Sequence, residues 1–295
     1  MHVTHLNCHM NGLCRFVLLL FGAALLLVAP TPTVSRANAP ARPPTTAIVL
    51  HLDGAIGPAT ADYVTRGLKA ATARKAPLVI LRMDTPGGLD SSMRDMVRAI
   101  LASPIPVATY VAPSGARGAS AGTFILYASH IAAMAPGTNV GAATPVQIGG
   151  VGSPEGKDEP KKGANAMEAK AINDAVAFLR SLAELRGRNA DWAEKAVRES
   201  ASLSASAALK AHVIDIEARD LGDLLGQMQG HVVTVAGRSV TIASAGLALE
   251  HRTPDWRTRM LAAITNPNIA ILLMMIGVYD GAPSVSENRG GIAKQ

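Results

Sequence analysis

The feature that most constrains the fold is a series of short, almost continuously apolar runs separated by segments with helical periodicity. The apolar runs are residues 46–52, 78–83 and 107–111. A strand without alternating polar side chains is buried on both faces, which is typical of a parallel sheet covered by helices. Helical segments at residues 60–74 and from Asp90 onward separate the runs. We therefore predict an α/β fold of repeated βαβ units.

The second half of the chain predicts more helix and then a short C-terminal β-hairpin. Residues 149–163 are polar and glycine-rich, which indicates a loop. Two strand-like runs, 231–235 and 239–242, are joined by Ala236-Gly237-Arg238, a typical hairpin turn. The remaining predicted elements are helices at residues 165–185, 191–200 and 204–210 and a strand at 213–217.

The N-terminus has the layout of an export signal. Arg15 precedes an apolar run at residues 16–29, and Ala37-Asn38-Ala39 supplies a cleavage pattern of small residues. The run is shorter than the about 20 residues that a spanning helix needs. We assign residues 1–39 to a signal peptide, with an uncleaved signal anchor as the alternative. The mature chain is therefore expected in the periplasm or another extracytoplasmic space.

The rest of the chain divides into a main domain and smaller segments. A proline-rich linker at residues 40–45 leads to the main domain at 46–230 and a β-hairpin extension at 231–265. Residues 266–279 contain the apolar run IAILLMMIGV, which is too short to cross a bilayer. We interpret it either as a buried helix or as a truncated membrane helix. A polar tail at 280–295 follows.

Composition excludes several classes of function. Both cysteines, Cys8 and Cys14, precede the apolar run at residues 16–29, so the exported chain would have no cysteine nucleophile, disulfide or thiolate metal site. Charged residues make up 17% and aromatic residues 3% of the chain, without a basic patch. We therefore expect no nucleic-acid binding, and we assign no metal and no cofactor.

Ser120 is the candidate nucleophile. It follows a Gly- and Pro-rich loop and stands between Gly118 and Gly122, in the G-x-S-x-G pattern of a nucleophile elbow. The amide of Ala121 and the dipole of a following helix would favour an oxyanion there. The alternative is that these small residues only pack a helix closely against a sheet.

A second glycine loop follows a neighbouring strand. Gly87 and Gly88 come directly after the apolar run at 78–83. Amides at the carboxyl ends of parallel strands face the crevice where α/β proteins bind ligands. The alternative is an ordinary Pro-Gly-Gly turn.

Histidine offers no clear general base. His51 and His130 lie in apolar strands and are interpreted as core or strand-end residues. His212, His231 and His251, together with Asp215, would permit the order Ser, Asp, His of an α/β-hydrolase. Such a fold would need more strands ahead of Ser120 than the sequence indicates.

Five ordered motifs carry a family resemblance. They are Asp53-Gly-Ala-Ile-Gly-Pro58, Asp84-Thr-Pro-Gly-Gly88, Gly118-Ala-Ser-Ala-Gly-Thr123, Met134-Ala-Pro-Gly-Thr138 and Ser181-Leu-Ala-Glu-Leu-Arg-Gly-Arg-Asn189. From about residue 47 to 220 the chain resembles the protease domain of the NfeD-type membrane serine proteases, the partners of stomatin-like proteins. That family lies within the Clp-protease and crotonase superfamily. The resemblance implies a Ser-Lys dyad of Ser120 and Lys170, with an oxyanion hole formed by the amides of Gly88 and Ala121.

The helix pattern around Lys170 does not by itself indicate a base. The main apolar stripe of the helix lies nearly opposite Lys170, and Asp174 is one turn away, where it could pair with the ammonium and hold its proton. From the residues alone Lys170 is interpreted as a surface lysine. The resemblance assigns it the role of general base.

The sequence therefore predicts an exported Ser-Lys endopeptidase that cleaves hydrophobic segments of membrane partners such as stomatin-like proteins. We also expect the protein to form a homo-oligomer, namely a dimer. The alternatives are a crotonase-like acyl-CoA enzyme and a catalytically inactive scaffold for membrane proteins.

Overall fold

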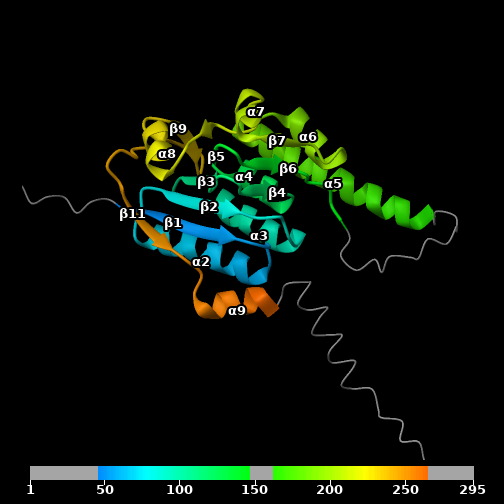
Figure 1. Ribbon diagram of the computed structural model, residues 1–295, viewed down its shortest axis with the longest axis horizontal. Coiled ribbons are helices and arrows are strands. Elements are labelled where there is room, and N and C mark those ends of the chain that lie inside the picture. The colour runs from blue at the N-terminus through cyan, green and yellow to red at the C-terminus, as the bar shows by residue number, and fades with distance from the viewer. Residues whose placement is uncertain (1–45, 147–161, 265–295) are drawn as a thin grey trace, which may run out of the picture. The chain divides into compact units, whose positions relative to one another are not determined.

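A parallel sheet forms the centre of the computed structural model, which describes residues 46–146 and 162–264. Six strands of the described residues pair in the order β11-β1-β2-β3-β5-β8, and every pairing is parallel. Figure 1 shows this sheet between its layers of helices. The strands are β1 (Thr46–Asp53), β2 (Val79–Asp84), β3 (Val107–Val111), β5 (Ile131–Met134), β8 (Ile216–Glu217) and β11 (Ala248–Arg252).

Helices cover both faces of the sheet and create two separate cores. Strand β1 is apolar from Ala47 to Leu52 except at His51, because Ile48, Leu50 and Leu52 enter one core whereas Ala47 and Val49 enter the other. Side chains of α2 to α7 fill the first core, and those of α8 fill the second. The helices are α2 (Pro58–Ala73), α3 (Asp90–Leu101), α4 (Ala121–Ala128), α5 (Lys162–Arg186), α6 (Ala190–Arg198), α7 (Ala205–Lys210), α8 (Leu221–Met228) and α9 (Trp256–Ile264).

Two smaller sheets complete the fold. Strands β9 (Val232–Val235) and β10 (Arg238–Thr241) form the antiparallel hairpin that the sequence predicts. A three-stranded sheet combines β4 (Arg117–Ala119), β6 (Asn139–Gly141) and β7 (Ser202–Ser204). Since Ser120 directly follows β4, this small sheet supports the segment that carries the candidate nucleophile.

The structure differs from the sequence predictions in several elements. The predicted strand at residues 213–217 is reduced to Ile216–Glu217, because the amides of Val213 and Ile214 bond the carbonyl of Ala208 at the end of α7. The segment predicted as a hairpin extension also contains β11, which joins the edge of the central sheet beside β1, and α9, which packs on α2. Strands β4, β6, β7 and β11 and helices α8 and α9 were not predicted from the sequence.

Several sequence predictions lie outside the described residues. These are the signal segment, the linker, most of the loop at 149–163, the apolar segment at 266–279 and the polar tail. Among the helices that the structure describes, none combines the length and hydropathy that crossing a bilayer requires.

Candidate active site

Ser120 occupies a strained turn between β4 and α4. Its backbone has φ 52° and ψ −116°, a left-handed conformation that L-residues rarely adopt. Its amide donates to the carbonyl of Gly141 over 2.9 Å, and its carbonyl accepts from the amide of Thr123 over 2.9 Å. The side chain does not cap the helix. Such strain costs about 1–3 kcal/mol and persists where the surroundings fix it, often at functional sites.

The glycine loop after β2 lies against Ser120. A Cβ placed on Gly87 would stand 2.6 Å from the Cβ of Ser120 and 3.0 Å from its Oγ. Gly87 also has φ +113°, so both its conformation and its surroundings require glycine here. The two glycine-rich loops that the sequence singles out therefore meet.

The backbone around Gly88 turns one amide away from the adjacent chain. Gly88 forms a parallel bridge with Ile56, in which the Ile56 amide donates to Gly87 O (2.8 Å) and the Leu89 amide donates to Ile56 O (2.9 Å). In this pattern the Gly87 carbonyl and the Leu89 amide face Ile56. The N–H of Gly88 itself therefore points away from Ile56. Ala121 is the first residue of α4, so its N–H has no intrahelical acceptor. Both amides are thus available to an oxyanion.

Small residues are also needed here for packing. A Cβ on Gly122 would lie 2.7 Å from Cγ2 of Thr85, and one on Gly118 would lie 3.0 Å from Cγ2 of Val111. The alternative reading of these two glycines, close packing of the loop and helix on the sheet, is therefore correct for them. It is compatible with a nucleophile at Ser120.

Two threonines that the sequence analysis missed hold the loops together. Oγ1 of Thr85 accepts the Gly87 amide (3.1 Å), while the Thr85 backbone pairs with β4 on the other side. Oγ1 of Thr123 lies 3.0 Å from the carbonyl oxygen of Gly118 and accepts the Gly141 amide (3.2 Å). The position of Thr85 between a strand and Pro-Gly could have indicated a side-chain-stabilised turn.

Ser120, Gly88 and Ala121 line one cavity. Its volume is about 270 Å³, and its walls are largely apolar. It adjoins a larger cavity of about 580 Å³, with which it shares Asp90, Pro145, Val146 and Ala175. The other apolar side chains around Ser120 are Leu89, Met93, Phe124 and Ala143.

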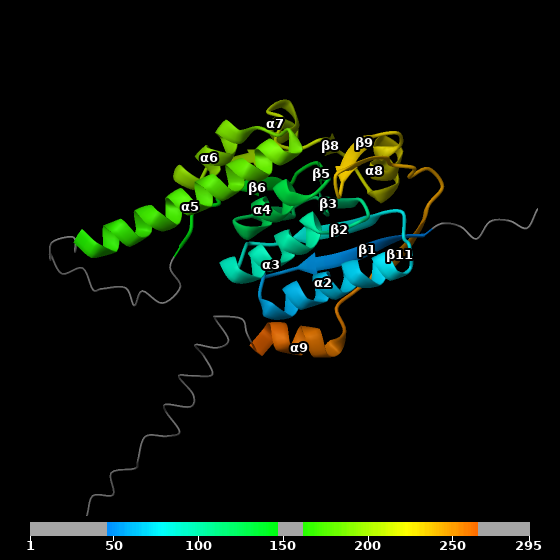
Figure 2. The same cartoon turned by 180° about the vertical axis from the view of Figure 1, so that it is seen from behind.

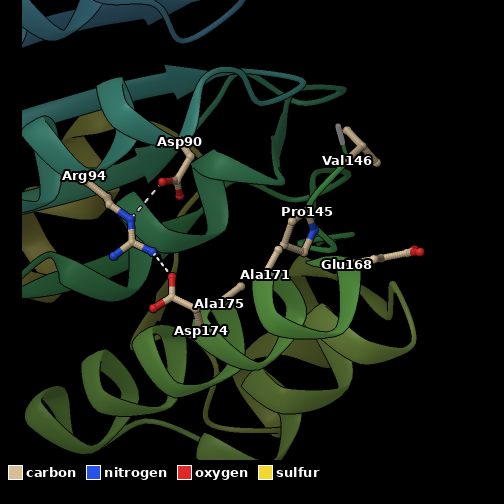
Figure 3. Close-up of a pocket in the computed structure, with 8 residues that line it drawn as sticks. All are labelled: Asp90, Arg94, Pro145, Val146, Glu168, Ala171, Asp174 and Ala175. Carbon is tan, nitrogen blue, oxygen red and sulfur yellow. Dashed lines mark hydrogen bonds and ion pairs between the residues drawn. The ribbon is translucent and has the colours of Figure 1, made fainter. Parts of the chain in front are cut away.

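The larger cavity, shown in Figure 3, is crossed by an arginine clamp between α3 and α5. The guanidinium of Arg94 pairs with Asp90 on its own helix (2.9 Å) and with Asp174 on α5 (2.5 Å). It also lies over the ring of Phe178 at 4.5 Å, and Phe178 stacks on Phe124 of α4. Asp174 therefore pairs with Arg94, not with Lys170 as its sequence position allowed.

Lys170 is not brought to Ser120 in this structure. It lies exposed on α5 and lines neither cavity, although Ala171, Asp174 and Ala175 of the same helix do. Figures 1 and 2 both show the N-terminal part of α5 projecting beyond the neighbouring helices. Ser120 and the two residues whose amides are predicted for the oxyanion hole thus lie at one cavity, whereas Lys170, the predicted base, does not line it.

The histidines serve other parts of the fold. His51 contacts His251 (2.9 Å) and Arg82 (3.2 Å), and Asp215 pairs with the buried Arg188 (2.6 Å). No histidine of residues 46–146 and 162–264 lines the cavity at Ser120. The Ser, Asp, His order considered for an α/β-hydrolase therefore has no geometric support.

A separate cavity of about 620 Å³ contains His130, Arg186, His212 and His231. Burial lowers the pKa of His130 to about 4, and the charge of Arg186 adds to this; burial likewise lowers the pKa of Arg186 to about 10. The Nδ1 atom of His130 accepts the Val107 amide (3.1 Å), so this imidazole is a satisfied core group, as predicted. Ser120 is not part of this cavity.

The strained serine, the paired glycine loops and the parallel sheet define a class of α/β proteins with a candidate site at the carboxyl ends of the strands, and comparison with known proteins identifies the family. The family model "NfeD1b, N-terminal domain" matches residues 47–232, and the chain belongs to this family. The resemblance carried by the five motifs is confirmed. A curated relative is the membrane-bound protease PH1510 of Pyrococcus horikoshii, 36% identical over 235 residues, which are 78% of this chain and 51% of that protein.

Other relatives agree with this assignment. Membrane protein NfeD1b of Bacillus subtilis is 40% identical over 99 residues, covering 33% of this chain and 22% of that protein. The chain thus spans about half or less of the curated relatives it matches.

Solved structures confirm the fold. The 1510-N membrane protease specific for a stomatin homolog from Pyrococcus horikoshii has 33% identity and a TM-score of 0.63, covering 75% of this chain and 99% of that one. A lysine-to-alanine mutant of the 1510-N membrane-bound stomatin-specific protease, in complex with a substrate peptide, has 34% identity and a TM-score of 0.66. It covers 76% of this chain and 100% of that one. The predicted α/β fold of the Clp-protease type is therefore correct.

Proposed function

We propose that this protein is an exported serine endopeptidase that uses a Ser-Lys dyad to cleave hydrophobic segments of a stomatin-like membrane partner. The observation that carries the proposal is the strained Ser120, which shares one apolar cavity with the outward-facing amides of Gly88 and Ala121. Two solved structures of one relative described as a stomatin-specific protease, 1510-N, support it: one is of a serine-to-alanine mutant and the other of a lysine-to-alanine mutant with a substrate peptide.

The proposed chemistry is acyl transfer. Oγ of Ser120 attacks the peptide carbonyl while the neutral amine of Lys170 takes its proton, and the amides of Gly88 and Ala121 donate to the oxyanion. The lysine then gives that proton to the leaving amine, and water hydrolyses the acyl-enzyme. The cavity at Ser120 has apolar walls and a volume of about 270 Å³, which suits a hydrophobic side chain of the substrate.

This mechanism requires Lys170 to approach Ser120 within hydrogen-bond reach, about 2.6–3.2 Å. A lysine acts as a base only when it is neutral, which desolvation favours. Lys170 is exposed, and the nearby Val146 and Met167 are 79% and 69% exposed. We propose that bound substrate and a second subunit of a homodimer cover this part of α5, exclude water and bring the amine to the serine.

The exposed position of Lys170 equally favours a second candidate, a catalytically inactive scaffold that binds membrane partners in the same groove. Cleavage separates the two. The full chain is incubated with a peptide of apolar sequence, and its products are identified by mass spectrometry. The peptidase predicts cleavage, whereas the scaffold predicts binding without products.

Four variants assign the residues. Ser120→Ala and Lys170→Ala should each abolish cleavage while leaving peptide binding, because they remove the nucleophile and the base. Ser206→Ala and Lys195→Ala are matched controls at exposed positions that line neither cavity, and they should cleave like the wild type. Wild-type rates in the Ser120 variant would refute the serine mechanism. Wild-type rates in the Lys170 variant alone would refute the dyad.

A further inference from the structure

Helix α9 (Trp256–Ile264) is packed with its apolar face outward. Trp256, Met260 and Ile264 follow one another at one-turn spacing and are 63%, 48% and 49% exposed. The buried residue of the helix is a polar one, Thr258, which is 6% exposed and turned toward α2. A helix of a globular domain normally buries its apolar stripe. The orientation of α9 is the reverse.

The inverted orientation is held by specific contacts. The Thr258 amide donates to Oδ1 of Asp255 (2.8 Å), which caps the start of the helix. Nη2 of Arg66 on α2 lies 3.5 Å from Oγ1 of Thr258. Figures 1 and 2 both show α9 beside α2, on the outer side of that helix. The apolar stripe is therefore presented by a docked helix.

Positive charge flanks the apolar stripe. Arg257 and Arg259 are exposed, and the guanidinium of Arg257 lies 5.4 Å from the ring centre of Trp256. Asp255 is the single acid of residues 255–264, and its carboxylate already accepts the Thr258 amide. Helix α9 is only weakly amphipathic as a whole, but its exposed tryptophan and aliphatic side chains next to arginines are the residue types found on helices that lie in a membrane interface. Trp favours the headgroup level of a bilayer, where arginine reaches phosphate.

The length of α9 and the chain beyond it distinguish a bilayer from a second copy of the protein. A stable protein interface buries roughly 800 Å² on each partner, which three side chains of a nine-residue helix do not approach. A lipid surface needs no such area when another apolar segment shares the attachment. In the sequence, the apolar run at residues 269–278 begins shortly after the helix ends at Ile264.

We propose that α9 lies in the headgroup layer of an anionic bilayer, with Trp256, Met260 and Ile264 inserted and Arg257 and Arg259 on lipid phosphates. The contact would hold the domain through α2 and α9 and fix which side of it faces the membrane. The relatives described as membrane-bound proteins do not specify such a surface.

The two tryptophans of the chain make a direct test. Trp192 is buried and stacks on Tyr127, and Trp192→Phe leaves Trp256 as the only tryptophan, which can be excited selectively at long wavelength. The full chain with this substitution is mixed with phosphatidylcholine vesicles, with and without phosphatidylglycerol. Acrylamide quenching and quenching by lipids brominated at different depths are then recorded.

The proposal predicts that anionic vesicles shift Trp256 emission to shorter wavelength and reduce acrylamide quenching several-fold. Lipids brominated near the headgroup should quench more than lipids brominated deep in the chains. Arg257→Gln and Arg259→Gln should each weaken partitioning into anionic vesicles about fivefold. Arg238→Gln, at an exposed position on β10, is the matched control and should change nothing.

Three outcomes would overturn the proposal. If acrylamide still quenches Trp256 fully when the protein is bound to vesicles, the protein attaches through other segments. Shielding of Trp256 that grows with protein concentration in the absence of lipid would indicate a second copy on this face. An absence of binding to anionic vesicles would also refute it. None of these measurements uses cleavage, so the result is independent of the proposed peptidase activity.

Discussion

Substitution of Gly88 by alanine tests the proposed oxyanion loop. A Cβ at this position would lie 2.0 Å from the carbonyl oxygen of Ile56 and 2.6 Å from its nitrogen. Ordinary contacts between carbon and a carbonyl oxygen begin at about 3.3 Å. Both clashing atoms belong to the backbone, so no side-chain rotation can relieve the overlap. The loop must move by more than about 1 Å.

The magnitude follows from the contacts that this movement breaks. The bridge between Ile56 and the glycine loop contains two backbone hydrogen bonds of 2.8 and 2.9 Å. At about 1 kcal/mol each, plus strain, their loss should lower the free energy of unfolding by about 2–3 kcal/mol. For a domain of this size that corresponds to a decrease in Tm of about 4–12 °C. Displacement of one oxyanion donor should reduce kcat about 10²–10³-fold.

Thermal unfolding reports the loss of stability, and peptide cleavage measured well below the lower of the two Tm values reports the loss of catalysis. Gly226→Ala is the matched control, because Gly226 lies inside α8 with nothing within 4 Å of its added Cβ. It should raise the free energy of unfolding by up to about 1 kcal/mol and leave kcat unchanged. If Gly88→Ala, verified as folded, cleaves peptide at the wild-type rate, the assignment of Gly88 to the oxyanion hole is wrong.

Two further predictions concern charged and titratable groups in the core. Arg188→Met should lower the free energy of unfolding by about 3–5 kcal/mol. The reason is that Arg188 is 7% exposed, pairs with Asp215 and donates to the Tyr127 carbonyl. A decrease below about 1 kcal/mol, measured by urea unfolding, would contradict this. His130 has its pKa lowered from 6.5 to about 4 by burial, so the unfolded chain binds the extra proton first as the pH falls. Its contribution to stability is complete above about pH 6.5 and decreases toward pH 4, by on the order of 3 kcal/mol. His130→Gln, which retains an acceptor for the Val107 amide, should flatten the dependence of Tm on pH in this window, and an unchanged slope would refute the assignment.

The strands of the main sheet were predictable where burial on both faces requires a continuous apolar run. Strands β1, β2 and β3 have such runs, and each was identified to within about one residue. Strand β11 has the sequence ALEHR, and its residues are intermediate or exposed because it lies at the sheet edge. Its pairing with β1 depends on a register that only the tertiary structure supplies. Strand β5, with the sequence IAAM, is short and rich in alanine, so the sequence indicated it only as the apolar strand beside His130 and without bounds.

At the candidate site, the sequence predicted which backbone segments would lie beside Ser120. Glycine at position 87 and a small residue at 121 are needed where the two loops approach each other closely, and the structure places both loops at Ser120. The supporting residues were missed, because nothing in the sequence indicates that Thr123 would bind backbone groups of two separate segments. Such contacts join residues 5 and 18 positions apart and depend on the complete fold.

Asp174 shows how the structure changes the interpretation of Lys170. In the sequence, Asp174 is one turn from Lys170 and would stabilise its ammonium form, which opposes a role as base. In the structure the carboxylate of Asp174 is bound by Arg94, whose guanidinium also contacts Phe178 of α5. Lys170 makes no ion pair with any residue of the described ranges. The clamp therefore engages the acid one turn from Lys170 and links α3 to the helix that carries Lys170. A role as base still requires the amine to approach Ser120 and to lose its surrounding water.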